Sequence, residues 1–275
     1  QNDSAWSNVL TAAIKVLPFI EKHFGKYPYP QYSFIQGGDG GMEYPMATLL
    51  IGSGLGTVFH EWMHSWYQMM LGTNESMYPW MDEGFTSYAE DIVSKFYNNK
   101  SSLQGFKDQL IKAPNNKRLA EMIDIVPENH SGAYISYFNL AKSGFEEPMT
   151  THSDHYESNY GYSSAAYSKG EVFLEQLGYI VGADVRDKIL LEYYKQWRFK
   201  HPNATDFMRV AEQVSGIQLD WYKEYWVNTT KTIDYRIDSL WEESGITKIR
   251  LRRTGKLPMP VDLQLTFKDG STEMF

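Results

Sequence analysis

The five residues HEWMH at positions 60–64 constrain this chain more than any other segment. Residues four positions apart on an α-helix project from the same face, so His60 and His64 can bind one metal ion together. Glu61 lies beside them, where a carboxylate can act as general base toward a water on the metal. For this segment alone, the alternative is a buried helix with two hydrogen-bonded histidines. We expect a helix over residues 55–71 that carries a metal site.

A third ligand follows at a suitable distance. Glu83 lies 19 positions after His64, which is enough chain to end one helix, turn and begin an antiparallel helix over residues 82–97. A histidine at position 70 would give a site with three histidines, but that residue is Met70. The chain has no cysteine, so metal ligands must come from His, Asp or Glu. Because catalytic zinc takes three protein ligands and keeps one position open, we expect one Zn²⁺ ion bound by His60, His64 and Glu83.

Other titratable residues have two interpretations each. Glu90 lies seven residues after Glu83 on the same helix face. It either accepts the free N–H of a metal-binding imidazole or is a solvated charge. His152 and His155 flank Asp154 and could indicate a second metal, but we expect a polar loop there.

Composition and charge limit the remaining function classes. Of the 275 residues, 42% are hydrophobic and 15% are aromatic, which supports a large core and argues against disorder. The formal net charge is −8, so we expect no binding to a nucleic-acid backbone. No run of about 18 apolar residues occurs, so no transmembrane segment is expected. The compartment stays open: periplasmic or secreted if a bacterial precursor carries a signal peptide, and cytoplasmic otherwise.

The N-terminal region predicts a helix followed by part of a sheet. Residues 4–24 have apolar side chains at helical spacing, and Pro18 is expected to kink or interrupt that helix. Residues 31–36 and 46–51 have the pattern of strands, and a glycine-rich turn at 37–41 lies between them. The two strands predict the edge of a sheet.

The rest of the chain changes character toward its C-terminus. Residues 101–227 are mostly helical in pattern, with breaks at 114–117 and 150–160. Three strand-like segments follow, at 232–240, 246–253 and 260–268. We therefore expect an α+β protein, mainly α, with one domain at 1–230 and a second at 231–275.

Three motifs occur in an order that is similar to a known family. HEWMH is followed, after 18 intervening residues, by Glu83 in WMDEGFTSYAE. GGMEYP spans residues 40–45, and YSKG spans residues 167–170. They resemble the zinc motif, the G-x-M-E-N exopeptidase motif and the Y-x-K-G segment of the gluzincin aminopeptidases of peptidase family M1. Aminopeptidase N and leukotriene A4 hydrolase belong to that family. The resemblance covers about residues 1–230.

The resemblance implies a thermolysin-like zinc peptidase domain, with a small sheet lobe and a helical lobe, followed by the start of a C-terminal β domain. It implies that Glu43 binds the ammonium group of a peptide with a free N-terminus, a role that suits a carboxylate. It implies that Tyr167 stabilises the oxyanion and that Tyr162 supports the same pocket. The neighbouring residues of the exopeptidase motif are expected to contact the substrate: Gly40, Gly41 and Met42. The family also has an N-terminal β domain, which we expect in the full-length protein.

These features predict a zinc-dependent aminopeptidase with Glu61 as general base. Tyr44 and Asp82 depart from the family pattern, because Asn is usual at both positions. Lys169 is expected to be a structural or surface residue. The alternatives are a non-catalytic zinc-binding scaffold of the same fold, or an endopeptidase or epoxide hydrolase variant.

Overall fold

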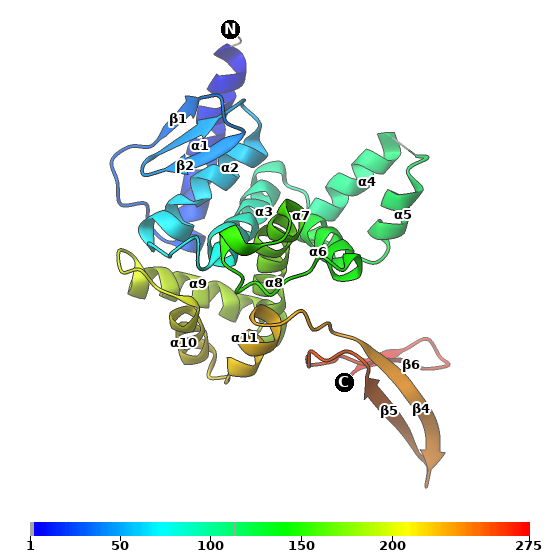
Figure 1. Ribbon diagram of the computed structural model, residues 1–275. Helices are drawn as coiled ribbons and strands as arrows, with labels where there is room; N and C mark the ends of the chain where they lie inside the picture. Colours follow the sequence, from blue (N-terminus) through cyan, green and yellow to red (C-terminus); the bar gives the residue numbers. More distant parts are fainter. Residues whose placement is uncertain (1–2, 113) are drawn as a thin grey trace. The chain divides into compact units, whose positions relative to one another are not determined.

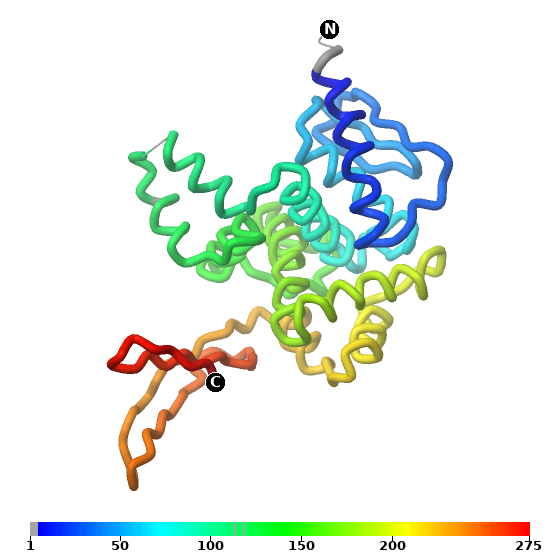
Figure 2. The backbone as a smooth tube through the Cα atoms, turned by 180° about the vertical axis from the view of Figure 1, so that it is seen from behind, coloured from blue at the N-terminus to red at the C-terminus, as the bar shows by residue number. Residues whose placement is uncertain are grey.

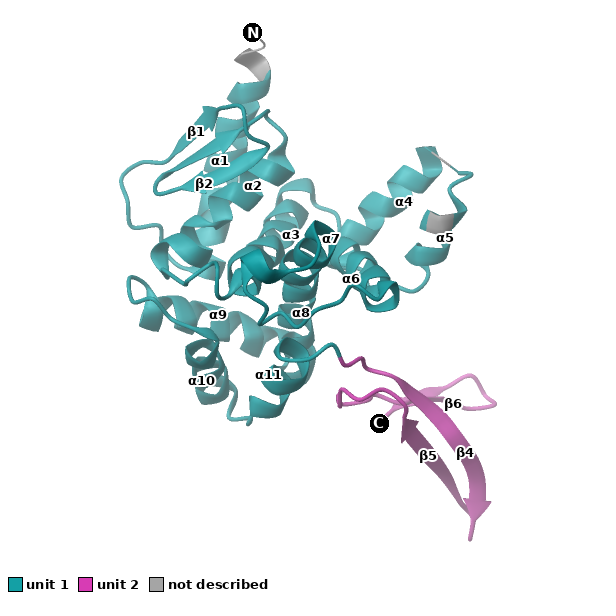
Figure 3. Ribbon diagram, viewed as in Figure 1, with its two compact units in different colours: residues 1–230 teal, residues 231–275 magenta. Residues whose placement is uncertain are grey.

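The computed structural model describes residues 3–112 and 114–275 (Figure 1). The chain divides into two compact units, Gln1–Thr230 and Lys231–Phe275 (Figure 3). The first unit is built mainly of helices with one small sheet, and the second contains strands. The predicted α+β class with a helical majority is therefore confirmed. Within the described residues, no helix combines the length and apolarity needed to cross a membrane.

The sheet of the first unit has three short strands in the order β1-β3-β2. β1 (Ser33–Gln36) pairs in parallel with β3 (Ala47–Leu50), and β2 (Gly41–Tyr44) pairs antiparallel with β3. The order leaves β2 at an edge of the sheet, with Glu43 opposite Thr48. Glu43 therefore lies on an edge strand.

The strand β2 corrects the sequence interpretation of this region. Residues 37–41 were expected to form a turn between two strands, but Gly41 already begins β2. The short reversal occurs instead after Tyr44, where Met46 has a positive φ of 59°. Because β2 comes between them in sequence, the two predicted strands run parallel through the sheet.

A long helix lies beside this sheet. α1 (Asp3–Phe24) lies behind the sheet in Figure 1 and in front of it in Figure 2, which is turned by 180°. Its buried positions include Val9, Val16 and Ile20, which share one helical face. The helix continues through Pro18, so the predicted interruption is wrong. Pro18 lies on the exposed side, where water can serve the carbonyl that loses its N–H partner.

The predicted helix over 55–71 ends earlier than expected. α2 (Leu55–Met63) is followed by a π-helical turn at Ser65–Met70, and Tyr67 and Gln68 have non-helical backbone angles. The segment around this break is buried, because His64, Trp66, Tyr67 and Met70 are each at most 1% exposed. Local periodicity favoured one continuous helix, so the break is a feature that the sequence pattern did not show.

The remaining helices of the first unit form the larger part of its core. A π-helical turn at Trp80–Gly84 leads into α3 (Phe85–Asn98), close to the predicted helix over 82–97. Phe85 packs edge-on against Trp80 and Phe207 at the centre. The helices that follow are α4 (Ser102–Lys112), α5 (Lys117–Ile123), α6 (Ser131–Ser143), α7 (Asn159–Ser163), α8 (Gly170–Val181), α9 (Ala183–Trp197), α10 (Ala204–Ser215) and α11 (Asp220–Val227).

The second unit contains two antiparallel strand pairs. β4 (Tyr235–Glu243) pairs with β5 (Ile246–Arg253), and β6 (Gln264–Thr266) pairs with β7 (Thr272–Met274). The first two strands lie close to their predicted ranges, and the third is shorter than its predicted range. The assignment of this unit as the start of a larger β domain stays a prediction.

Candidate metal centre

The three expected metal ligands converge. His60 and His64 project from the end of α2, and Glu83 comes from the π-helical turn before α3. Glu83 Oε2 lies 3.2 Å from His60 Nε2 and 3.3 Å from His64 Nε2. Tetrahedral ligands placed about 2 Å from a zinc ion are about 3.3 Å from one another. The donor atoms therefore fit a metal ion with little rearrangement.

Each imidazole also has a carboxylate at its other nitrogen. Glu90 Oε2 lies 3.3 Å from His60 Nδ1, and Asp82 Oδ1 lies 2.8 Å from His64 Nδ1. Such contacts fix the tautomer that presents Nε2 to a metal. Glu90 was expected as a candidate for this position, whereas Asp82 was noted only as a departure from a family pattern. Its place directly before Glu83 was the signal available in the sequence.

Positive charge is strongly favoured between these side chains. Although burial lowers the pKa of His60, hydrogen bonds to Glu83 and Glu90 raise it to about 9. Burial raises the pKa of Glu83, but the hydrogen bonds from both imidazoles lower it to about 2. Protons supply the positive charge in the metal-free protein, and a bound dication would replace them.

Glu61 lies beside the ligands in a confined position. It is 7% exposed, and its Oε2 has no hydrogen-bond partner among the described residues. Burial raises its pKa above the usual value, so the carboxylate is disposed to take a proton. Gly41 approaches it so closely that a Cβ at this position would overlap Glu61 Oε1. The glycine of the exopeptidase motif therefore makes room for the predicted base.

The other residues of that motif differ in their surroundings. A carboxylate oxygen of Glu43 lies within 4.8 Å of ligand atoms of Glu61 and His64. Burial raises the pKa of Glu43. A Cβ on Gly40 would meet no atom within 4 Å, and Met42 is partly exposed. The structure thus brings Glu43 and Gly41 to the centre and leaves Gly40 in open space.

Two tyrosines complete the centre. Tyr167 Oη donates a 2.6 Å hydrogen bond to Glu83 Oε1, and its ring stacks on His60 with 5.7 Å between centroids. Burial raises the pKa of Tyr167 far above its usual value, so the phenol keeps its proton. The ring of Tyr162 lies 6.5 Å from that of Tyr167, nearly perpendicular to it. Both predicted tyrosines therefore lie at the site.

Two glycines that sequence reasoning did not assign hold these elements together. A Cβ on Gly84 would come within 2.6 Å of Gly170 Cα, and a Cβ on Gly170 within 2.9 Å of Gly84 Cα. The segment that carries Glu83 therefore touches the segment that carries Tyr167 backbone to backbone. The signal available in the sequence was that one glycine directly follows Glu83 and the other ends the Y-S-K-G motif.

Lys169 is buried between these elements. It has no exposed side-chain surface, and its Nζ lies 2.8 Å from Glu146 Oε1. Its expected structural role fits this position.

A cavity of about 470 Å³ opens at the candidate metal centre and is lined in part by Thr57, His60 and Tyr167.

The alternative second metal site has weaker geometry. His152 Nδ1 lies 3.9 Å from Asp154 Oδ2, and it accepts a hydrogen bond from the Asp154 backbone N–H. His152 and His155 lie at a short 3₁₀ turn, Ser153–His155, with exposed neighbours. The arrangement is that of a polar loop.

Comparison with known proteins gives a consistent family. The model of the peptidase family M1 domain matches residues 9–226. A leukotriene A-4 hydrolase homolog from Botryotinia fuckeliana is 26% identical over 209 residues, covering 70% of this chain and 29% of that protein. Human aminopeptidase B is 27% identical over 224 residues, covering 77% of this chain and 30% of that protein. The chain thus spans less than a third of the length of these relatives.

Solved structures share the fold. The M1 zinc metallopeptidase from Deinococcus radiodurans aligns with a TM-score of 0.59 at 17% identity, covering 80% of this chain and 44% of that chain. A mutant of the same enzyme bound to a Tyr-Ser-Ala substrate aligns with a TM-score of 0.57 at 17% identity, covering 78% of this chain and 43% of that chain. At these identities, the similarity establishes the fold.

Proposed function

This chain belongs to peptidase family M1, and from that premise we propose that it is the catalytic part of a zinc-dependent aminopeptidase. The observation that carries the proposal is the convergence of two imidazoles on one carboxylate oxygen of Glu83. The buried Glu61 and the protonated Tyr167 beside this group provide the remaining parts of a hydrolytic site. Zinc is the ion that this set of two His and one Glu suits best.

Zinc held by His60, His64 and Glu83 would polarise the scissile carbonyl and make a water nucleophilic. Glu61 would accept the proton of the attacking water and deliver it to the leaving amine. Its unpartnered Oε2 and its raised pKa support that role. Tyr167 would donate its proton in a hydrogen bond to the oxyanion as charge develops.

We propose that Glu43 selects the end of the substrate. Its carboxylate lies on the edge strand β2, beside Glu61 and His64, where it would pair with the free ammonium group of a peptide. The partner is therefore a peptide with a free N-terminus, and one residue is removed at a time. Gly41, Met42 and Tyr162 would contact the first residue of such a peptide.

The experiment uses an aminoacyl chromogenic substrate, assayed before and after chelation and again after zinc is restored. We expect activity to disappear with the chelator and to return with zinc. Glu61→Gln should retain bound zinc and lose about 10²–10⁴-fold in kcat, because it cannot accept the proton. Activity that survives this change with zinc bound would contradict the mechanism and favour a different base.

A second comparison separates exopeptidase from endopeptidase action. Glu43→Ala should reduce cleavage of peptides with a free amine far more than cleavage of N-blocked peptides. Equal losses on both would indicate an endopeptidase. A protein that binds zinc but cleaves neither would be the non-catalytic scaffold.

We propose further that the whole protein is longer than this chain and includes an N-terminal β domain. Each of the two relatives is more than three times as long as the segment of it that this chain matches. The compartment in which the protein acts stays a prediction.

A further inference from the structure

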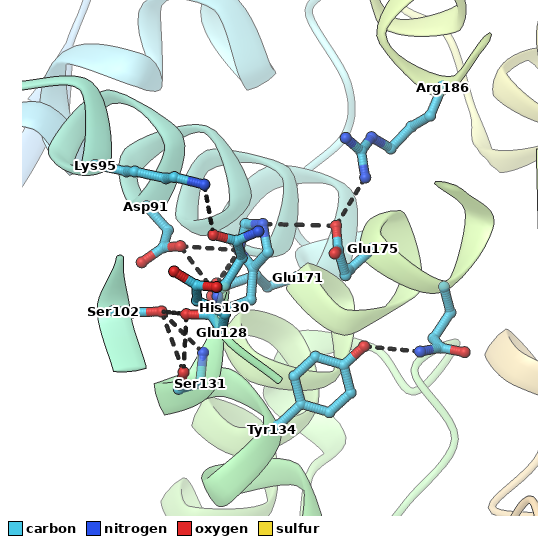
Figure 4. Close-up of polar contacts among 12 residues, drawn as sticks. Asp91, Lys95, Ser102, Glu128, His130, Ser131, Tyr134, Glu171, Glu175 and Arg186 are labelled. Atoms are coloured by element: carbon cyan, nitrogen blue, oxygen red, sulfur yellow. Dashed lines mark hydrogen bonds and ion pairs between the residues drawn. The ribbon is translucent and has the colours of Figure 1, made fainter. Parts of the chain in front are cut away.

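A second group of convergent side chains shares no residue with the three candidate zinc ligands, although Asp91 directly follows Glu90, which contacts His60 (Figure 4). His130, the residue before α6, faces Asp91 of α3 and Glu171 of α8. Its Nδ1 lies 2.7 Å from Glu171 Oε1 and 3.4 Å from Asp91 Oδ2. The imidazole is 3% exposed. Three metal-ligand atoms from three segments of the chain therefore meet at one buried point.

We propose that Asp91, His130 and Glu171 bind a second divalent metal ion of the zinc type. One imidazole with two carboxylates suits zinc and similar transition metals better than calcium or magnesium. The distance from His130 Nδ1 to Asp91 already equals the roughly 3.3 Å expected between tetrahedral ligands. The Glu171 carboxylate would move outward by about 0.6 Å to reach the same spacing. The proposal does not depend on the peptidase activity.

The other ring nitrogen of His130 supports this interpretation. Its Nε2 lies 3.7 Å from Glu175 Oε2, and Arg186 holds that carboxylate at 2.7 Å. Both imidazoles of the candidate metal centre have the same arrangement, with a carboxylate at the nitrogen that faces away from the metal. Metal-binding histidines usually have such a group at the nitrogen that faces away from the metal. An ion at Nδ1 would displace the proton that Nδ1 shares with Glu171, and the N–H would then lie on Nε2, which faces Glu175.

The charges of the group also leave a place for a dication. Asp91, Glu171 and Glu175 present three carboxylates, and among the described residues Arg186 is the one Lys or Arg in an ion pair with them. Arg186 also pairs with Asp187 at 3.1 Å, so its charge is shared with a fourth carboxylate. A divalent ion that displaces a proton from His130 would supply positive charge to Asp91 and Glu171.

The backbone holds His130 in an uncommon conformation. Its φ is +56°, in the left-handed region, and its N–H donates a 3.1 Å hydrogen bond to Asp91 Oδ2. Its ring stacks on Tyr88, with 4.7 Å between centroids and 13° between planes. Strained residues of this kind concentrate at functional sites, because the surroundings must hold them in place. Here the backbone hydrogen bond and the ring stacking orient the His130 imidazole and the Asp91 carboxylate relative to each other.

Cavities on two sides give the group access to solvent. Asp91 lines one cavity of about 380 Å³ together with Glu171, and another of about 650 Å³ together with His130. Asp91 therefore borders both cavities, from which water could complete the coordination of an ion that has three protein ligands.

The experiment counts metal ions on the full 275-residue chain. Protein stripped with a chelator is loaded with Zn²⁺, freed of excess metal, and measured by native mass spectrometry. We expect two ions on the unchanged chain, and one on His130→Gln and on Glu171→Gln. His152→Gln changes a histidine of the polar loop and is the control that keeps both ions.

A variant at the other site separates the two ions. His64→Gln should keep one ion, and the double variant His64→Gln/His130→Gln should keep none. Zinc should raise the Tm of His64→Gln but not that of the double variant. If the unchanged chain binds one ion and His130→Gln keeps it, the group is a buried ion-pair network and the proposal is wrong. Asp91→Asn, which preserves shape, repeats the count if His130→Gln does not fold.

Discussion

Tyr167 Oη donates a 2.6 Å hydrogen bond to Glu83 Oε1, across 84 residues of sequence. The other oxygen of the same carboxylate faces His60 Nε2 and His64 Nε2. The Glu83 side chain thus links the imidazoles of His60 and His64, at the end of α2, to the phenol of Tyr167, which precedes α8. The distance in space between these two segments determines whether Tyr167 can stabilise an oxyanion at the centre, because such stabilisation requires donors within hydrogen-bond distance.

Replacing Tyr167 tests the oxyanion role directly. Tyr167→Phe should lower kcat by about 10²–10³-fold, as expected when one oxyanion donor is removed. KM and zinc content should change little, because the phenol is not a predicted ligand. Steady-state kinetics and metal analysis check both expectations. Tyr160→Phe, at a partly exposed tyrosine of α7, is the control, and equal losses in both variants would contradict the role.

The close approach of Gly84 to Gly170 predicts that a single methyl group will disturb the site. In Gly84→Ala the new Cβ would meet Gly170 Cα at 2.6 Å and Ala166 O at 2.7 Å, so the two segments must separate. We expect a loss of about 1–3 kcal/mol in the free energy of unfolding, together with reduced kcat. Urea unfolding and kinetics measure the two effects.

Gly105→Ala is the matched control for that change. A Cβ there meets no atom within 4 Å, and the glycine lies inside α4. Alanine should stabilise this helix by about 0.5–1 kcal/mol, because it restricts the unfolded chain. A Gly84→Ala protein as stable and active as Gly105→Ala would show that the backbone contact is unimportant.

Gly41→Ala should misplace the predicted base without removing it. The added Cβ would overlap Glu61 Oε1, so the carboxylate has to shift. A displacement of about 1 Å can cost about 10²-fold in rate, and we expect a loss of that order in kcat/KM. Gly38→Ala is the control, because the Cβ there meets nothing within 4 Å and the residue has no predicted substrate contact. Similar losses for both would show that the overlap with Glu61 is not the cause.

Lys169→Ala should lower the free energy of unfolding. The change leaves the buried Glu146 carboxylate without its 2.8 Å partner, which typically costs about 3–5 kcal/mol. Lys100→Ala removes an exposed lysine that pairs with Asp108 and should leave Tm nearly unchanged. Adding Glu146→Gln to Lys169→Ala should recover part of the loss. No recovery would mean that packing of the lysine stem, rather than charge, stabilises this region.

Local spacing was enough to predict which side chains meet at the candidate metal centre. His60 and His64 share a helix face because of helical periodicity, and the length of chain before Glu83 allows an antiparallel return. The structure places these side chains together, as the sequence predicted. The family motifs added Glu43 and Tyr167, whose positions no local pattern fixes.

Several features depended on contacts between distant residues. The break at Tyr67 and Gln68 could not be predicted, because helical periodicity continues through it in the sequence. The contact of Asp82 with His64 required two segments to be placed against each other in space. Local propensity is a weak preference that tertiary packing overrides.

The sequence by itself determined which residues can bind a metal ion, because their types and helical spacing are local properties. Only the tertiary structure decided how Gly84 meets Gly170 and how Asp91, His130 and Glu171 meet one another. His130 lies 39 residues after Asp91 and 41 residues before Glu171. Contacts over such separations form only when the helices pack, since the burial of apolar side chains outweighs the entropy of closing the intervening chain.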